Sequence, residues 1–179
     1  MSPFPLHGTG KAPSYSGLTS AELVECFSTF KDQHIHAFIR LWMTEGVPWI
    51  FASCPFIYED IRSWIARELV IGPKAVSLVG SSRFGFSLSE DTYGRPFTPD
   101  SDLDLVCVDQ SLFLKCKLDA LKWIDDFESG TVRPNSAGEE KYWPKNRDTL
   151  KLQEKSGFVQ TTYVPARNQY GNNSRVLEL

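Results

Sequence analysis

Two short apolar runs, separated by a polar segment, place the strongest constraint on how this chain can fold. The first, residues 75–80, reads AVSLVG, and the second, residues 101–108, reads SDLDLVCV. Short apolar runs of this kind, bounded by Gly, Ser or Pro, predict two strands of a core sheet. Asp102 and Asp104 therefore occupy positions where a core strand would ordinarily carry valine.

The spacing of Asp102 and Asp104 indicates a divalent cation. Side chains alternate along a strand, so both carboxylates point to one face, where they repel each other and lose hydration if they are buried. Bound Mg²⁺ or Mn²⁺ relieves both costs and takes its remaining ligands from water and substrate phosphates. The sequence therefore predicts a phosphate-handling metal site. The alternative is that both carboxylates are exposed at a strand edge or in a turn, with Ser101 as a cap.

The end of the first strand is the second candidate feature. Gly80 permits close approach of a ligand to the backbone, and the segment that follows, SSRFGFS, predicts a short helix or turn. The hydroxyls and backbone N–H groups of Ser81 and Ser82 would then cradle a phosphate. Arg83 would add a charge-assisted contact to the phosphate, or would pair with a surface acid.

Together these motifs resemble the nucleotidyltransferase superfamily of DNA polymerase β. That family has an apolar residue followed by Gly-Ser, a spacer, and Asp-apolar-Asp-apolar, which LVGSSRFG and SDLDLVCV match over roughly residues 56–127. The resemblance implies an α/β nucleotidyltransferase fold, with a small mixed sheet, packed helices and an N-terminal helical extension. It also implies that Gly80 and Ser81 contact the nucleoside triphosphate, and that Asp102 and Asp104 are catalytic and bind two Mg²⁺ or Mn²⁺ ions.

The chain departs from the family pattern first in its spacer. Twenty residues separate Ser81 from Asp102, which is more than the family usually has. The additional piece, SEDTYGRPFTPD at residues 89–100, contains Gly and Pro and predicts a surface loop that could cover the substrate.

The second departure concerns a third carboxylate, which the family usually places on a later strand. The later strand predicted here, GFVQTTYVP at residues 157–165, contains no acid, and Asp148 and Glu154 precede it in a predicted helix. Either the chain lacks this ligand, or a partner or the substrate supplies it, or activity is lost.

Around this motif the sequence predicts a flexible arm at residues 1–18 and a single domain at residues 19–179. Its further elements, predicted from helical spacing, caps and breakers, are helices at 21–45 (capped by Thr19 or Ser20), 57–69, 112–129 (capped by Ser111) and 148–155, with a loop at 131–147.

Bulk composition limits the protein classes that remain. A net charge of −3 argues against a globally basic nucleic-acid binder. Cys26, Cys54, Cys107 and Cys116 are scattered without C-x-x-C spacing, which is typical of reduced thiols in a cytoplasmic protein rather than of disulfides or a zinc site. No apolar run has the length of a membrane span and no signal peptide is recognisable, so we expect no membrane association.

These observations lead to one principal functional hypothesis and two alternatives. The resemblance implies metal-dependent transfer of a nucleoside monophosphate from an NTP to a protein, RNA, nucleotide or small-molecule acceptor, in the setting of a toxin–antitoxin or antiphage module. The first alternative is a catalytically degenerate relative that binds a nucleotide or a protein partner. The second is a small regulatory protein whose Asp-Leu-Asp segment binds a cation.

Overall fold

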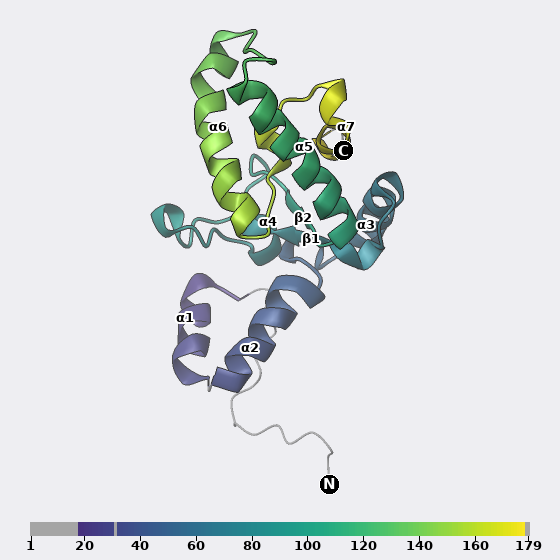
Figure 1. The fold of residues 1–179 in the computed structure, drawn as a ribbon. Helices are drawn as coiled ribbons and strands as arrows, with labels where there is room; N and C mark the ends of the chain where they lie inside the picture. The colour runs from purple at the N-terminus through teal and green to yellow at the C-terminus, as the bar shows by residue number, and fades with distance from the viewer. Residues whose placement is uncertain (1–17, 31, 178–179) are drawn as a thin grey trace. The chain divides into compact units, whose positions relative to one another are not determined.

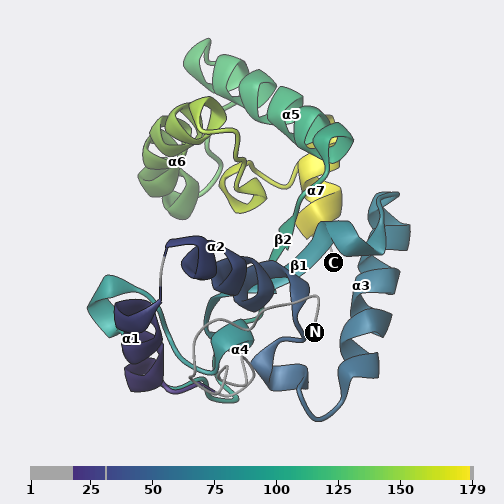
Figure 2. The same ribbon diagram turned by 90° about the horizontal axis from the view of Figure 1, so that it is seen from below.

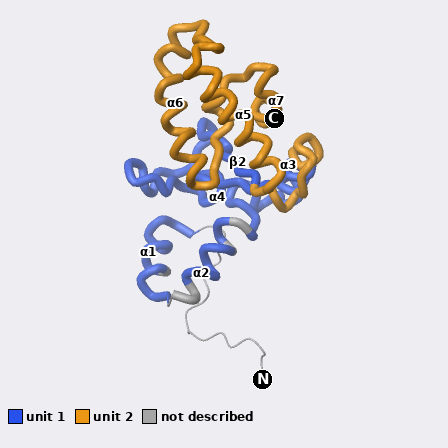
Figure 3. The backbone as a smooth tube through the Cα atoms, in the orientation of Figure 1, with its two compact units in different colours: residues 1–63, 76–107 blue, residues 64–75, 108–179 orange. Residues whose placement is uncertain are grey.

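The computed structural model describes residues 18–30 and 32–177. Contacts divide the chain into two compact units, coloured separately in Figure 3: unit 1, of residues 1–63 and 76–107, and unit 2, of residues 64–75 and 108–179. The single domain expected from the sequence stays a prediction. Residues 1–17 of the expected arm lie outside the described residues, and its last residue, Leu18, is buried.

The N-terminal region of unit 1 forms two helices where the sequence predicts one. α1 comprises Ser20–Thr29 and α2 comprises Asp32–Arg40, followed by a π-helical turn at Leu41–Glu45 (Figure 1). The expected cap is confirmed, because Thr19 Oγ1 accepts a hydrogen bond from the Glu22 backbone N–H at 3.3 Å. Glu22 reciprocates through Oε2, which accepts from the Thr19 N–H at 2.8 Å.

Side-chain hydroxyls near the end of α1 explain why the helix stops early. Ser28 Oγ and Thr29 Oγ1 both donate to the carbonyl oxygen of Glu25, at 2.8 and 3.1 Å. Such bonds compete with the backbone ladder of a helix and favour its termination. Apolar periodicity alone could not reveal this competition.

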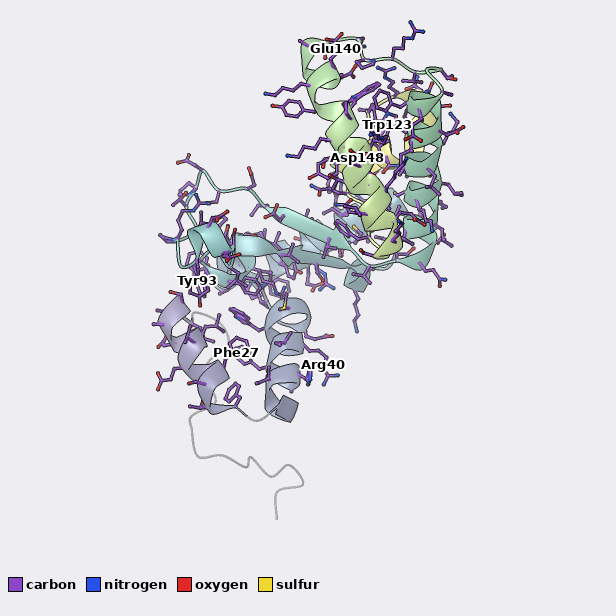
Figure 4. All side chains as sticks on the ribbon, turned by 60° about the vertical axis from the view of Figure 1, so that its left-hand side comes forward. Phe27, Arg40, Tyr93, Trp123, Glu140 and Asp148 are labelled. Atoms are coloured by element: carbon purple, nitrogen blue, oxygen red, sulfur yellow. The ribbon has the colours of Figure 1, made fainter. Side chains whose placement is uncertain are left out.

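An aromatic cluster forms the core beneath α1 and α2. Phe27 lies between the two helices in Figure 4, and its ring centroid is 5.8 Å from that of Phe38. Trp42 continues the stack onto Phe84, at 4.1 Å between centroids. The buried members of the cluster are Leu18, Leu23, Phe38, Trp42, Phe84 and Phe86.

The predicted third helix is confirmed as α3, Pro55–Leu69, which begins two residues earlier than the periodicity indicates. Proline fits the first position of a helix, because its missing N–H would have no partner there. A single 3₁₀ turn, Trp49–Phe51, precedes it, and a second one, Pro73–Ala75, leads into the sheet.

Both predicted strands are present and pair with each other. β1, Val76–Val79, runs antiparallel to β2, Asp104–Cys107, with Val76 opposite Cys107 and Val79 opposite Asp104. The short helix α4, Gly80–Phe84, follows β1 directly. The described part of the chain is thus a mixed α/β structure, mostly helical, whose sheet has two antiparallel strands rather than the mixed set expected.

After β2, unit 2 is built on three helices. α5 comprises Gln110–Glu128, α6 comprises Ala137–Lys155, and α7 comprises Gly171–Leu177; α6 and α7 both lie against α5 (Figure 2). The core between them contains Trp123 and Tyr170, which are fully buried. None of the helices within residues 18–30 and 32–177 combines the length and apolar character that a membrane crossing requires.

The N-terminal boundaries of α5 and α6 correct two predictions. Asp109, not Ser111, caps α5, since its Oδ1 accepts from the Leu112 N–H at 2.8 Å. The expected loop at 131–147 is largely helical, because Ser136 caps α6 by accepting from the Glu139 N–H at 3.2 Å.

Proline and local hydrogen bonds misled the prediction of the C-terminal region. Pro144 lies inside α6 on an exposed position, so the carbonyl that loses its helical partner can bind water. Residues 157–165, expected as a strand, instead contain a 3₁₀ turn at Thr161–Tyr163. The N–H groups of these residues make local hydrogen bonds instead. The Phe158 N–H donates to the backbone carbonyl of Gln153, and the Gln160 N–H donates to Gln153 Oε1. No third strand therefore extends the sheet in the described chain.

Candidate functional site

A pocket of about 430 Å³ opens in unit 1 where β1 ends and β2 begins. Ser81 lines it from α4, and Asp102 and Asp104 line it from β2 and the residues just before it. The antiparallel register brings these segments together, because Asp104 is opposite Val79, the last residue before Gly80. The two motifs singled out from the sequence therefore share one pocket.

Gly80 lies beside Asp104, which is one of the residues that line the pocket. Gly80 has a φ of +68°, and a Cβ atom placed on it would lie 2.5 Å from Oδ2 of Asp104. Any other residue would suffer backbone strain at this φ and would displace the carboxylate. The backbone conformation thus favours glycine at this position, and a Cβ there would also move the exposed Asp104 carboxylate.

Asp102 and Asp104 are exposed rather than buried. Asp104 is the first residue of β2, and Asp102 precedes the strand in a segment where Ser101 Oγ accepts from the Thr98 N–H at 3.1 Å. Exposure and the Ser101 cap match the alternative interpretation, so no desolvation cost requires a cation. What favours a binding role is that both carboxylates face the same pocket.

The donor set limits how a metal could be held. Among the side chains that the structure describes, no three of His, Cys, Asp or Glu are arranged around a common metal position. Two carboxylates nevertheless fit Mg²⁺, which is commonly held by one or two carboxylates together with water and phosphate oxygens. Asp102 and Asp104 are the residues that would hold it.

Ser82 and Arg83 do not face the pocket, contrary to prediction. Ser82 is fully buried, and its Oγ donates to the carbonyl of Val79 at 3.0 Å. Arg83 is 3% exposed and donates to three backbone carbonyls: those of Trp42 at 2.6 Å, Gly46 at 3.1 Å and Leu78 at 3.3 Å. Its guanidinium satisfies buried carbonyl groups and braces α4 against β1 and the turn after α2, so it is not available to a phosphate.

Ser81 is the residue of α4 that remains available. It is partly exposed and lines the pocket, while its carbonyl accepts from the Gly85 N–H at 2.8 Å. α4 has only five residues, so we attribute no anion site to the end of this helix. The Ser81 hydroxyl is the group that could contact a ligand.

The long spacer forms a wall of the pocket. Phe86 and Pro96 form an isolated antiparallel bridge, and the Phe97 N–H donates to the Gly85 carbonyl at 2.8 Å. The tip of this hairpin-like segment is tied to α1, because Tyr93 Oη donates to the Ser20 carbonyl at 3.1 Å (Figure 4). The expected surface loop is therefore an ordered part of the site.

Two charged residues of the pocket lining were not identified from the sequence. Asp100 adds a third carboxylate to the lining, and Arg95 adds a cation from the hairpin. Asp100 continues the two-residue spacing of Asp102 and Asp104 and could have been recognised by it. Arg95 had no such signal, because only the hairpin brings it to the pocket. Asp148 and Glu154, weighed for the missing carboxylate, lie on α6 in unit 2, where they pair with Arg147 and Lys117.

Comparison of the chain with protein-family models, with curated proteins and with solved structures finds no match.

Proposed function

We propose that unit 1 is a metal-dependent nucleotidyltransferase domain, which moves a nucleoside monophosphate from an NTP to an acceptor. The observation that carries the proposal is that Gly80 lies beside Asp104, which lines a pocket together with Ser81 and Asp102. This places the Gly-Ser motif and the paired carboxylates side by side, as the resemblance requires. Asp100 is a third carboxylate of the pocket lining, but it does not join Asp102 and Asp104 around a common metal position.

Each residue has a distinct role in this proposal. Asp102 and Asp104 would hold Mg²⁺ or Mn²⁺, which supplies charge neutralisation on the phosphates and activation of the acceptor hydroxyl. Ser81 would donate a hydrogen bond to a phosphate oxygen, and Gly80 would let the ligand approach the backbone. In the reaction the acceptor oxygen bonds to the α-phosphorus, and the bond between this phosphorus and the oxygen that bridges to the β-phosphorus breaks. Pyrophosphate leaves with that oxygen, and the acceptor hydroxyl gives its proton to solvent water.

A non-catalytic nucleotide-binding or partner-binding module is the second candidate. It is favoured by the absence, in the part of the chain that is described, of three acidic, histidine or cysteine side chains around one metal position. Mg²⁺-dependent NTP binding without pyrophosphate release would distinguish this module from an enzyme.

The principal proposal also includes an acceptor, a location and a biological setting. The acceptor is a protein, an RNA, a nucleotide or a small molecule. The location is cytoplasmic, and the setting is a toxin–antitoxin or antiphage module.

The test is pyrophosphate release from each of the four NTPs with Mg²⁺ or Mn²⁺, with cell extract as a source of acceptor. We expect release by the wild type and a loss of at least 100-fold in Asp102→Asn and Asp104→Asn, since single electrostatic groups at such sites are worth about that much. Asp91→Asn is the matched control, because Asp91 is an exposed carboxylate outside the pocket lining of unit 1. Equal release by all four proteins would overturn the proposal.

A further inference from the structure

We propose that Arg95 binds the polyphosphate chain of the substrate, an inference that rests on the proposed function and assigns its phosphate-binding residue. A nucleoside triphosphate brings about four negative charges to a pocket that already contains three carboxylates, so its binding requires cations. The sequence offers Arg83 either for this role or for a pair with a surface acid, but its guanidinium is buried among backbone carbonyls. The role must fall to another side chain.

Arg95 is the basic residue among the described residues that line the pocket. Its side chain is exposed, and within residues 18–30 and 32–177 its guanidinium makes no hydrogen bond or ion pair. All of its donors are therefore available. A guanidinium presents them in a planar fork that matches two oxygens of a phosphate.

The unpaired charges of the pocket support this assignment. Asp100, Asp102 and Asp104 share the pocket with Arg95, yet none of them forms an ion pair with it. The pocket thus contains three carboxylates and a guanidinium that are not paired with one another. A metal–polyphosphate complex has the complementary charges, with the cation suited to the carboxylates and the outer phosphates suited to the arginine.

The backbone holds Arg95 at a defined position on the pocket wall. Its N–H donates to the Thr92 carbonyl at 3.0 Å, and its carbonyl accepts from the Ser87 N–H at 2.8 Å. Ser87 also accepts from the Gly94 N–H at 2.9 Å, which closes the hairpin around the same point. Binding would then order the side chain of Arg95 but not its backbone, and this lowers the entropic cost.

Calorimetric titration of the full chain with inorganic tripolyphosphate and with ATP, in Mg²⁺, tests the inference. We expect Arg95→Gln to weaken binding of both about 10- to 100-fold, as for loss of hydrogen bonds to a charged group, and Arg95→Lys to lie between. Adenosine binding should not change. Arg175→Gln is the control, since Arg175 is exposed, carries the same charge and does not line the pocket.

The outcomes separate this inference from the proposed function. If wild type and Arg95→Gln bind tripolyphosphate equally while Asp102→Asn loses pyrophosphate release, the assignment of Arg95 is wrong and the nucleotidyltransferase stands. If tripolyphosphate binding depends on Arg95 but no NTP releases pyrophosphate, the transfer activity is wrong and Arg95 remains a polyphosphate-binding residue. The unfolding temperature should be unchanged in Arg95→Gln, because the side chain has no partner to lose.

Discussion

Gly80 and Asp104 are in such close contact that a Cβ atom on the glycine would lie 2.5 Å from Oδ2 of the aspartate. The relationship follows from the sheet, in which Asp104 is paired with Val79, the residue before Gly80. It links the two sequence motifs of the site through a direct contact. A substitution at either residue should therefore change the position of the other.

Gly80→Ala should impair ligand binding more than it impairs stability. The φ of +68° costs a residue with a Cβ about 1–2 kcal/mol, and the new methyl group must also displace the Asp104 carboxylate from its present position. We expect a modest loss in the free energy of unfolding, measured in urea, together with loss of Mg²⁺-dependent NTP binding, measured by calorimetry.

Gly130→Ala separates backbone strain from the contact with Asp104. Gly130 has a similar φ of +74°, but a Cβ there would meet no atom within 4 Å. The variant should lose comparable stability and keep full NTP binding. If both glycine variants bind NTP equally well, the contact between Gly80 and Asp104 has no part in the site.

Arg83→Gln should destabilise unit 1 rather than affect the ligand directly. It removes the donors of three carbonyl groups, at Trp42, Gly46 and Leu78, in a buried environment. We expect a loss of about 2–4 kcal/mol in the free energy of unfolding. Arg95→Gln provides the comparison, because an exposed side chain without partners should change stability by less than about 0.5 kcal/mol. Equal urea midpoints for the two variants would contradict the structural role of Arg83.

Asp100→Asn should reduce activity less than Asp102→Asn does. Asp100 lines the pocket, but no three such side chains share one metal position in the described chain. A Mg²⁺ titration of pyrophosphate release should therefore show a shift of less than about 10-fold in the half-saturating concentration, against at least 100-fold for Asp102→Asn. Equal effects of the two substitutions would make Asp100 a full metal ligand.

The stability of unit 2 should depend on pH partly through the Asp126 carboxyl. Hydrogen bonds from Lys122 and then Tyr170 lower the pKa of the Asp126 carboxyl below its usual value. A lowered folded-state pKa means that this stabilisation is fully present above the unfolded pKa of about 3.9 and is lost as the pH falls through the folded value. The advantage of the wild type over Asp126→Asn, measured in urea, should therefore shrink between about pH 5 and pH 2.

Asp125→Asn is the control for this pH series. Asp125 is exposed next to Asp126, and its side chain makes no hydrogen bond or ion pair within the described residues. Its substitution should leave the difference from wild type constant across the same pH range. A constant difference for Asp126→Asn as well would mean that its hydrogen bonds do not stabilise the folded unit.

Local signals allowed the sequence to predict the elements that frame the site. Thr19 and Glu22 mark the start of α1, helical spacing marks α3, and the apolar runs mark β1 and β2. Each of these signals depends on residues that are only a few positions apart, so the sequence itself shows the interactions that form the element. The glycine after β1 and the aspartate at the start of β2 were recognised for the same reason.

The predictions that failed depended on partners far away in the sequence. Arg83 looked like a phosphate ligand beside Ser81, but carbonyls 37 and 41 residues earlier bury it. Pro144 looked like a helix breaker, but its position on α6 is exposed while Trp143 and Leu150 are buried in the core of unit 2. Residues 157–165 had the composition of a strand, but the end of α6 takes up their hydrogen bonds.

The sequence by itself determined that a Gly-Ser segment would follow one strand and that Asp104 would belong to the next, because periodicity and turn chemistry are local properties. Only the tertiary structure decided which charges face the pocket. It buried Arg83, exposed Asp102 and Asp104, and brought Arg95 and Asp100 to the same pocket. The physical reason is that burial and charge pairing depend on which distant backbone segments pack together, and residue spacing does not contain that information.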